Sequence, residues 1–173
     1  MSLMRAHVKF EVRRYFDASP RELWDELVDW KAHEQWIPMT RVELGEGDPT
    51  APGHVLTAWT GPGPLALEDV MRVEECEWDD EGQFGTCVVE KLGPVLSGHA
   101  GFTILTSGSG ATMEWFEDVS VKYVPSILAP IVRRLSAAGF SFGMRRLERN
   151  MRSRRHPSKR GRDVAREIRG TTS

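Results

Sequence analysis

The middle of the chain limits the fold most strongly, because six segments with the composition of strands follow one another with only short runs of turn residues between them. We expect strands over residues 41–44, 54–60, 65–77, 83–92, 98–106 and 111–123. Residues 79–82 and 107–110 have the composition of hairpin turns. Connections this short leave no room for crossover helices, so the sheet is predicted to be antiparallel.

The segment before this region predicts one more strand and two short helices. Residues 7–16 alternate between apolar and polar types, which is typical of a half-buried strand. Ser19, Pro20 and Glu22 then form the pattern of a helix N-terminus, with a capping serine, a proline at the first helical position and a glutamate that completes a capping box. A second short helix is expected to end at Trp36.

The periodicity changes after residue 123 to spacings of three and four, which predicts one long helix over residues 126–152. Two apolar stripes run along it. The first contains Leu128, Ile131, Leu135, Ala138 and Phe142, and the second contains Phe140, Met144, Leu147 and Met151. Residues 153–173 are basic and have little to bury, so we expect a folded domain over 1–152 followed by a disordered basic tail.

This order of elements predicts an α+β fold in which a curved antiparallel sheet of about seven strands wraps round the long helix, with a cavity between them. The chain resembles the START-like helix-grip superfamily (SRPBCC), and within it the polyketide cyclase/dehydrase and lipid-transport family. The resemblance rests on residues 19–24 and 29–38, on the turn that leads into 112–115, and on the closing helix over 128–148; it spans residues 7 to about 152. It implies the helix-grip fold but no single activity, because such families include carriers, lipid binders and aromatase/cyclase enzymes.

Composition excludes several classes of protein. With 173 residues, one domain is expected, and no apolar stretch is long enough for a spanning helix or a secretory signal. The two cysteines, Cys76 and Cys87, are too few for a disulfide scaffold or a four-ligand zinc site, which favours a reducing, cytoplasmic location. Gly61 and Gly63 alternate with prolines, which is unlike a phosphate-binding loop. We therefore expect no metal and no cofactor.

Two carboxylates are the candidate catalytic residues. Strand alternation places Asp69 and Glu117 on the same faces as apolar neighbours, so both are expected to point inward. A buried carboxylate needs a donor, a water or a ligand. Three interpretations stay open: general acid and base catalysis, orientation of a ligand hydroxyl, and a structural role such as an ion pair with Arg14 or emergence at the sheet edge.

The expected ligand-binding residues combine flexible thioethers with rigid aromatic rings, which suits an adaptable apolar site. They are Trp36, Met39, Trp59, Met71, His99, Met113, Trp115, Phe140 and Met144. His99 is the one histidine expected at the cavity edge, whereas His33 is expected on an exposed short helix.

Charge is distributed unevenly along the chain. Residues 1–124 contain 10 Lys or Arg and 22 Asp or Glu, while residues 125–173 contain 13 and 3. The basic C-terminal segment could meet an anionic membrane, nucleic acid or the acidic body of the protein. Nucleic acid is disfavoured because the tail has no aromatic residues for base stacking.

Three functions therefore remain open, and the sequence leaves the oligomeric state undecided. The first is a soluble carrier for a small apolar ligand of the lipid, polyketide or isoprenoid kind. The second is a cyclase/dehydratase-type enzyme that uses Asp69 or Glu117. The third is an interaction module that uses the basic C-terminal segment, with weak anionic membrane contact as one possibility.

Overall fold

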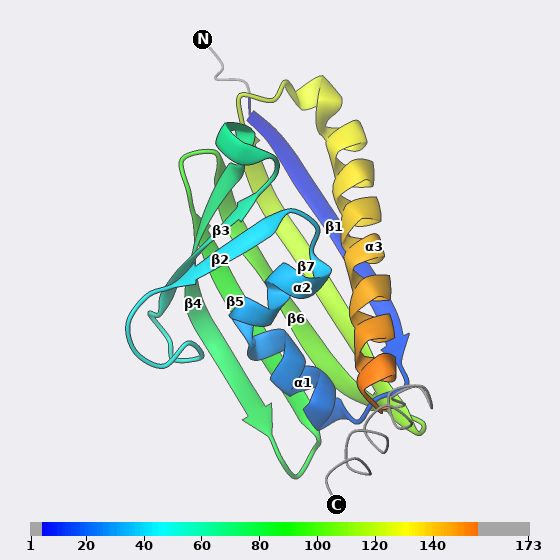
Figure 1. Ribbon diagram of the computed structural model, residues 1–173. Coiled ribbons are helices and arrows are strands. Elements are labelled where there is room, and N and C mark those ends of the chain that lie inside the picture. Colours follow the sequence, from blue (N-terminus) through cyan, green and yellow to red (C-terminus); the bar gives the residue numbers. More distant parts are fainter. Residues whose placement is uncertain (1–4, 156–173) are drawn as a thin grey trace, which may run out of the picture.

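Seven antiparallel strands form one sheet, and the helices cover one of its faces (Figure 1). The computed structural model describes residues 5–155. The strands are β1 (Arg5–Phe16), β2 (Thr40–Leu44), β3 (Val55–Thr60), β4 (Leu67–Asp79), β5 (Phe84–Leu92), β6 (Leu96–Ser107) and β7 (Gly110–Lys122). Their order in the sheet is β1-β7-β6-β5-β4-β3-β2, and every neighbouring pair is antiparallel. The predicted α+β fold with an antiparallel seven-stranded sheet is confirmed.

The first helix begins where the sequence predicted. They are α1 (Pro20–Val28), η1 (Trp30–Ala32), α2 (His33–Trp36), η2 (Gly63–Leu65), η3 (Ser126–Leu128) and α3 (Ala129–Arg155). At the N-terminus of α1, the backbone N–H of Glu22 donates to Ser19 Oγ at 3.2 Å, and Glu22 Oε2 accepts from the Ser19 backbone N–H at 2.9 Å. The predicted capping box is therefore present. Within residues 5–155, no helix is long and apolar enough to cross a membrane.

The core lies between the sheet and the helices. Alternate residues of β1, from Ala6 to Phe16, point toward it, as strand geometry requires. The largest fully buried side chains include Trp36, Phe102, Met113 and Leu147. These residues come from α2, from two central strands and from α3, so burial of apolar surface joins the two layers.

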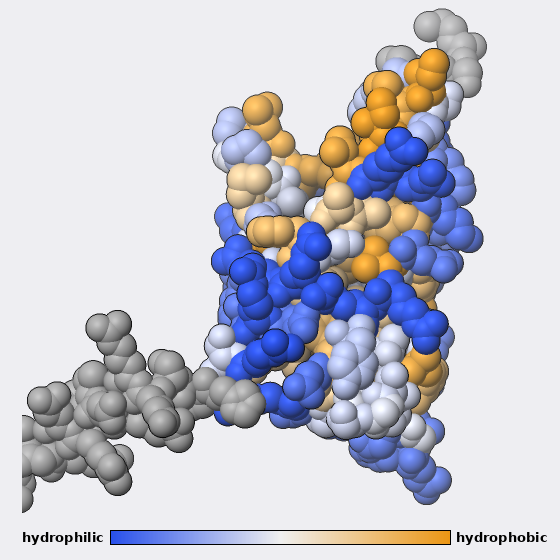
Figure 2. Space-filling view, turned by 90° about the vertical axis from the view of Figure 1, so that its right-hand side faces the viewer, coloured by the Kyte–Doolittle hydropathy of each residue, from blue (hydrophilic) through white to orange (hydrophobic). Residues whose placement is uncertain are grey.

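The long helix differs from its prediction in two ways. Only the stripe with Met144, Leu147 and Met151 is buried, whereas Ile131 and Leu135 of the other stripe are exposed. Figure 2 shows hydrophobic residues gathered at one end of this side of the molecule. The helix also continues to Arg155, past the predicted boundary at residue 152. The remainder of the expected tail, residues 156–173, lies outside the described residues.

Candidate functional site

A cavity of about 190 Å³ lies between the inner face of the sheet and the helices. Its walls are mainly apolar and aromatic. The lining residues from η1, α2 and the segment after it are Trp30, His33 and Ile37, those from the sheet include Met71, Val89, Phe102 and Trp115, and α3 contributes Phe140. This volume is smaller than the roughly 300–1,000 Å³ of typical drug-sized ligand sites. The cavity therefore fits a small guest without rearrangement.

Three charged side chains meet in the wall of this cavity. Lys91 on β5 lies with its Nζ 2.5 Å from Asp69 Oδ2 on β4 and 3.8 Å from Glu117 Oε2 on β7. Strand β6 separates β5 from β7, and its residue in register with Glu117 is the small Ala100. Because alanine leaves space above the sheet, the long lysine side chain can interact across β6.

Burial and the attraction between opposite charges together set the pKa values of Lys91 and Glu117 in this cluster. Burial alone would lower the pKa of Lys91, but Glu117 and Asp69 together raise it, so the lysine is charged at neutral pH. Burial raises the pKa of Glu117, and the attraction of Lys91 offsets this only in part. Proton exchange by Glu117 therefore occurs closer to neutral pH than for an ordinary glutamate.

The cluster leaves one acceptor without a partner among the described residues. Asp69 Oδ1 is buried and receives no hydrogen bond, although Asp69 Oδ2 accepts from Lys91. Glu117 Oε1 accepts a long hydrogen bond of 3.4 Å from Trp115 Nε1. A buried acceptor without a donor costs on the order of 1–3 kcal/mol, which a bound hydroxyl would relieve.

Comparison with known proteins identifies the family. The profile of the family described as "Polyketide cyclase / dehydrase and lipid transport" matches residues 7–152. The chain belongs to this family. No curated protein matches the sequence.

Solved structures with the same fold include several proteins of low sequence identity. A STAR-related lipid transfer protein from Xanthomonas axonopodis is 18% identical, with a TM-score of 0.63 over 83% of this chain and 85% of that one. A protein from Thermus thermophilus is 14% identical, with a TM-score of 0.64 over 82% and 94% of the two chains. Ara h 8.0201 is 16% identical, with a TM-score of 0.53 over 82% and 99%. At these identities the likeness shows the fold alone.

The candidate residues of this polyketide cyclase/dehydrase and lipid transport family member fall into three groups. Asp69, Met71, Trp115, Glu117 and Phe140 line the cavity. Trp36, Met113 and Met144 are fully buried in the surrounding core. Met39, Trp59 and His99 are not among the residues that line the cavity.

Each of these last three has a local reason for its position. Met39 is 68% exposed in a turn where its φ is +53°. Trp59 points to the opposite face from the cavity-lining Ala58, and the guanidinium of Arg41 lies 4.5 Å from its ring centroid. His99 lies on the outer face of the sheet, with its Nε2 3.4 Å from Glu74 Oε2. The structure thus leaves these three side chains outside the set that lines the cavity, and their contact with a ligand stays a prediction.

His33 also differs from its expectation, because it is buried. Its Nε2 lies 2.8 Å from the backbone oxygen of Leu27, and its ring is between those of Trp30 and Trp36, with centroid distances of 5.4 and 4.6 Å. Burial lowers the pKa of His33 to about 4, so the imidazole is neutral at neutral pH and Nε2–H donates to Leu27. His33 therefore gives the cavity an uncharged wall.

Lys91 is the residue that the sequence interpretation missed. A signal for it exists, because Cys87, Val89 and Lys91 alternate along β5 and share its buried face. Arg14, the expected ion-pair partner of the carboxylates, instead pairs with Glu148 of α3, with Nε donating to Oε2 at 3.1 Å. The inward carboxylates thus have a lysine partner that came from a different strand.

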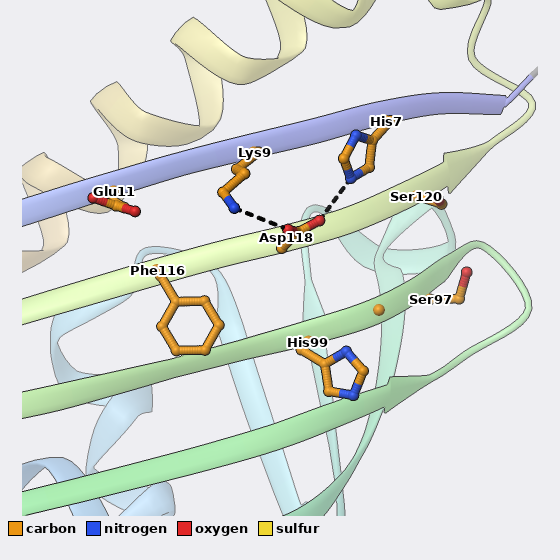
Figure 3. A pocket seen from close by; sticks show the side chains of 9 residues that line it. His7, Lys9, Glu11, Ser97, His99, Phe116, Asp118 and Ser120 are labelled. Carbon is orange, nitrogen blue, oxygen red and sulfur yellow. Dashed lines mark hydrogen bonds and ion pairs between the residues drawn. The ribbon is translucent and has the colours of Figure 1, made fainter.

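A second depression lies on the outer face of the sheet, between β1, β6 and β7 (Figure 3). There, Asp118 Oδ1 is 2.6 Å from His7 Nε2, and Asp118 Oδ2 is 3.3 Å from Lys9 Nζ. Hydrogen bonds from these two residues lower the pKa of Asp118. Because these groups satisfy one another and are solvated, the inner cavity is the better candidate site.

Metal ligands are not gathered anywhere in the part of the chain that the structure describes: residues 5–155 contain no group of three or more His, Cys, Asp or Glu suited to a metal ion.

Cys76 and Cys87 are in register on β4 and β5, and both are free thiols. A hydrogen bond with Cys76, together with burial, raises the pKa of the Cys87 thiol. Cys87 is therefore a poor nucleophile despite its place in the cavity wall.

Proposed function

We propose that this protein binds a small, mostly apolar molecule that carries a hydroxyl group, of the lipid, polyketide or isoprenoid kind. The observation that carries the proposal is the unpartnered buried Asp69 Oδ1 in an otherwise apolar cavity. A ligand hydroxyl donates to this oxygen, and its own oxygen accepts from the Lys91 ammonium. The apolar part of the ligand packs against Trp115, Phe140 and Met71.

Family membership supports the same class of ligand. The family description includes lipid transport, and a solved structure of similar fold is named as a STAR-related lipid transfer protein. The cavity volume of about 190 Å³ favours a compact ligand or a small part of a longer one. We therefore use a bicyclic probe to test the proposal.

The test compares 1-naphthol with naphthalene, which differ only in the hydroxyl group. We expect the protein to bind naphthol more tightly, as measured by quenching of tryptophan fluorescence, and Trp115→Ala to weaken both probes. Asp69→Asn should reduce the preference for naphthol at least fivefold, because a buried hydrogen bond to a charged acceptor contributes on the order of 1.5–3 kcal/mol.

Asp118→Asn is the matched control, because it makes the same change on the outer face of the sheet. It should leave the affinities for both probes unchanged. Equal affinity of the wild-type protein for naphthol and naphthalene, or equal effects of the two substitutions, would contradict the proposal.

A cyclase/dehydratase-type enzyme is the second candidate, and the raised pKa of Glu117 favours it. A glutamate whose pKa is raised by burial keeps its proton to higher pH than an ordinary glutamate and can donate it to a substrate oxygen, and Lys91 stabilises the carboxylate that remains. With a substrate in hand, Asp69→Asn and Glu117→Gln should each lower kcat by about a hundredfold or more if the carboxylate is a general acid or base. A change confined to KM would assign that carboxylate to orientation.

Two further predictions stay open. A reducing, cytoplasmic location rests on the small number of cysteines, since Cys76 and Cys87 are the only two in the sequence. Contact of the basic tail with an anionic membrane concerns residues that lie almost entirely outside the described part of the chain.

A further inference from the structure

The N-terminal part of α3, together with η3, carries an apolar stripe that no residue within 5–155 covers. Ile127 is 81% exposed, Leu135 is 68% exposed and Ile131 is 54% exposed. These positions recur at a spacing of four, so they lie on one face of the helical segment. Exposed apolar surface of this kind usually marks an interaction site.

A second apolar projection lies at the same end of the molecule. Leu65 of η2 is 82% exposed, and the exposed Met39 is adjacent, because the Gly61 N–H donates to the Met39 backbone oxygen at 3.0 Å. Figure 1 shows η2 and η3 at the same end, and Figure 2 shows hydrophobic residues on both sides of a notch there. We call Met39, Leu65, Ile127, Ile131 and Leu135 the apolar end.

The apolar end is close to the cavity. Thr60, directly before the loop that contains η2, and Phe140 of α3 both line the cavity. Each of the two projections is therefore connected along the chain to a residue of the cavity wall. A partner that covers the apolar end would also cover this side of the cavity.

The charge around the apolar end selects the partner. On the η3 and α3 side of the apolar end, the sequence from Val119 to Leu135 contains three Lys or Arg residues and no Asp or Glu, whereas on the η2 side Glu68, three residues after Leu65, is exposed. Arg133 and Arg134 are exposed and are adjacent in sequence to the apolar stripe. A second copy of the chain bound through the η3 and α3 side would bring two positively charged surfaces together, which disfavours a symmetric dimer. An apolar surface bordered by arginines instead fits anionic lipid headgroups above acyl chains.

We propose that the apolar end docks on an anionic lipid bilayer. Leu65, Ile131 and Leu135 insert between the lipids, while Arg133 and Arg134 contact the headgroup phosphates. This surface goes beyond ligand binding, because docking does not require an occupied cavity. It is also distinct from the basic tail, which follows the opposite end of α3 (Figure 1).

The test is sedimentation of the full-length protein with phosphatidylcholine vesicles, with and without about 30% phosphatidylglycerol, at about 0.1 M salt. Wild-type protein should bind the anionic vesicles at least tenfold more tightly than the neutral ones. Arg133→Glu with Arg134→Glu should lower anionic binding at least tenfold. Ile131→Asp with Leu135→Asp should do the same, and both double variants should fold because all four side chains are exposed.

Matched controls separate this end from other surfaces. Arg149→Glu with Arg152→Glu makes the same charge change at the other end of α3, where both side chains are exposed. Phe84→Asp adds a charge at an exposed apolar residue at the start of β5. Each control should change vesicle binding by less than twofold.

Three results would overturn the proposal. The first is a loss of binding in Arg149→Glu/Arg152→Glu as large as in Arg133→Glu/Arg134→Glu, because the attraction would then not belong to the apolar end. The second is unchanged binding of Ile131→Asp/Leu135→Asp. The third is a wild-type dimer in solution that the same apolar substitutions dissociate. Naphthol binding by these variants is measured separately, so failure of docking is distinguishable from failure of ligand binding.

Discussion

Individual buried titratable residues make the stability of this protein dependent on pH in two opposite directions. His33 is buried in its neutral form, and burial lowers its pKa to about 4. Glu117 is buried beside Lys91, and burial raises its pKa. Because the two groups act in overlapping ranges of pH, only substitution of each one separates their contributions.

His33 should stabilise the fold at neutral pH and lose this contribution in acid. A folded-state pKa of about 4, below the ordinary histidine value of 6.5, means that the unfolded chain takes up the proton first as the pH falls. Its contribution is therefore complete above pH 6.5 and is lost as the pH falls through 4. Urea unfolding measures this effect. Between about pH 7 and about pH 4, the free energy of unfolding should fall by about 3 kcal/mol less in His33→Gln than in the wild type.

Glu117 should have the opposite effect. Its folded-state pKa lies above the ordinary glutamate value of 4.5, so its contribution is present below that value and is lost as the pH rises through the raised pKa. We expect the free energy of unfolding of Glu117→Gln to increase relative to wild type over this range, by about 1.4 kcal/mol for each pH unit that separates the folded-state and unfolded-state pKa values. Glu114→Gln, on the exposed side of the same strand, is the control; a parallel increase in that variant would contradict the assignment.

At the scale of elements, α3 combines a packed half with an exposed half. Two glycines lie where these halves meet. A Cβ at Gly143 would be 3.4 Å from both the ring and the backbone oxygen of Trp36, so this glycine allows the helix to pack closely on α2. A Cβ at Gly139 would meet nothing within 4 Å. Only Gly143 therefore has a packing reason.

Alanine substitution should distinguish the two positions. Gly139→Ala should raise the free energy of unfolding by about 0.5–1 kcal/mol, because it improves helix propensity in open space. Gly143→Ala should gain less or lose stability, because its new methyl group contacts Trp36. Urea unfolding of the two variants measures the difference, and a larger gain at Gly143 would show that α3 and α2 are not in close contact.

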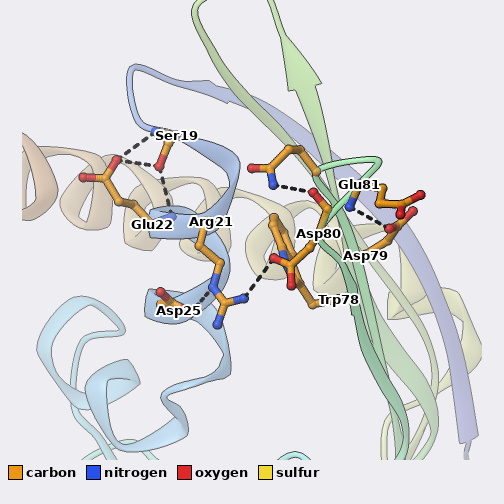
Figure 4. Close-up of polar contacts among 9 residues, drawn as sticks. Ser19, Arg21, Glu22, Asp25, Trp78, Asp79, Asp80 and Glu81 are labelled. Atoms are coloured by element: carbon orange, nitrogen blue, oxygen red, sulfur yellow. Dashed lines mark hydrogen bonds and ion pairs between the residues drawn. The ribbon is translucent and has the colours of Figure 1, made fainter.

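At the scale of the whole molecule, the two ends differ in how they are closed. At one end, Arg21 connects α1 to the β4–β5 hairpin, because its Nη1 lies 3.6 Å from Asp80 Oδ1 (Figure 4). Within α1, Arg21 Nε lies 2.9 Å from Asp25 Oδ1. Within the hairpin, Trp78 Nε1 donates to Asp80 Oδ1 at 2.7 Å. The opposite end, where η2 and η3 lie, carries the exposed residues of the apolar end (Figure 1). Polar contacts therefore connect α1 to the hairpin at one end, whereas the other end presents apolar side chains that suit a partner.

The last residues of α3 strengthen the closed end. Arg154 donates to Glu26 at 2.6 Å, and Arg155 donates to the backbone oxygen of Asp17 at 2.6 Å. A chain that stops at Arg155 should keep the Tm of the full protein, whereas one that stops at Arg152 should melt about 2–6 °C lower, because each lost contact contributes up to about 1 kcal/mol. Calorimetry decides this, and equal Tm values for the two chains would place the boundary at residue 152.

The sequence by itself determined the elements that depend on local patterns. Strand alternation, turn composition and the residues around Ser19 act within a few positions, so the antiparallel sheet, the capped helix and the long final helix could all be predicted. The inward faces of β4 and β7 also follow from alternation, which is why the two carboxylates were identifiable from the sequence.

Tertiary structure decided which of several equivalent local choices is used. In β3, the sets Leu56 with Ala58 and Val55 with Trp59 are both apolar, so alternation alone could not tell which faces the cavity. In α3, two apolar stripes compete, and the sheet has room for one. The Lys91 cluster depends on a small residue on the strand between its members. These outcomes are set by packing between segments distant in sequence, which local periodicity does not contain.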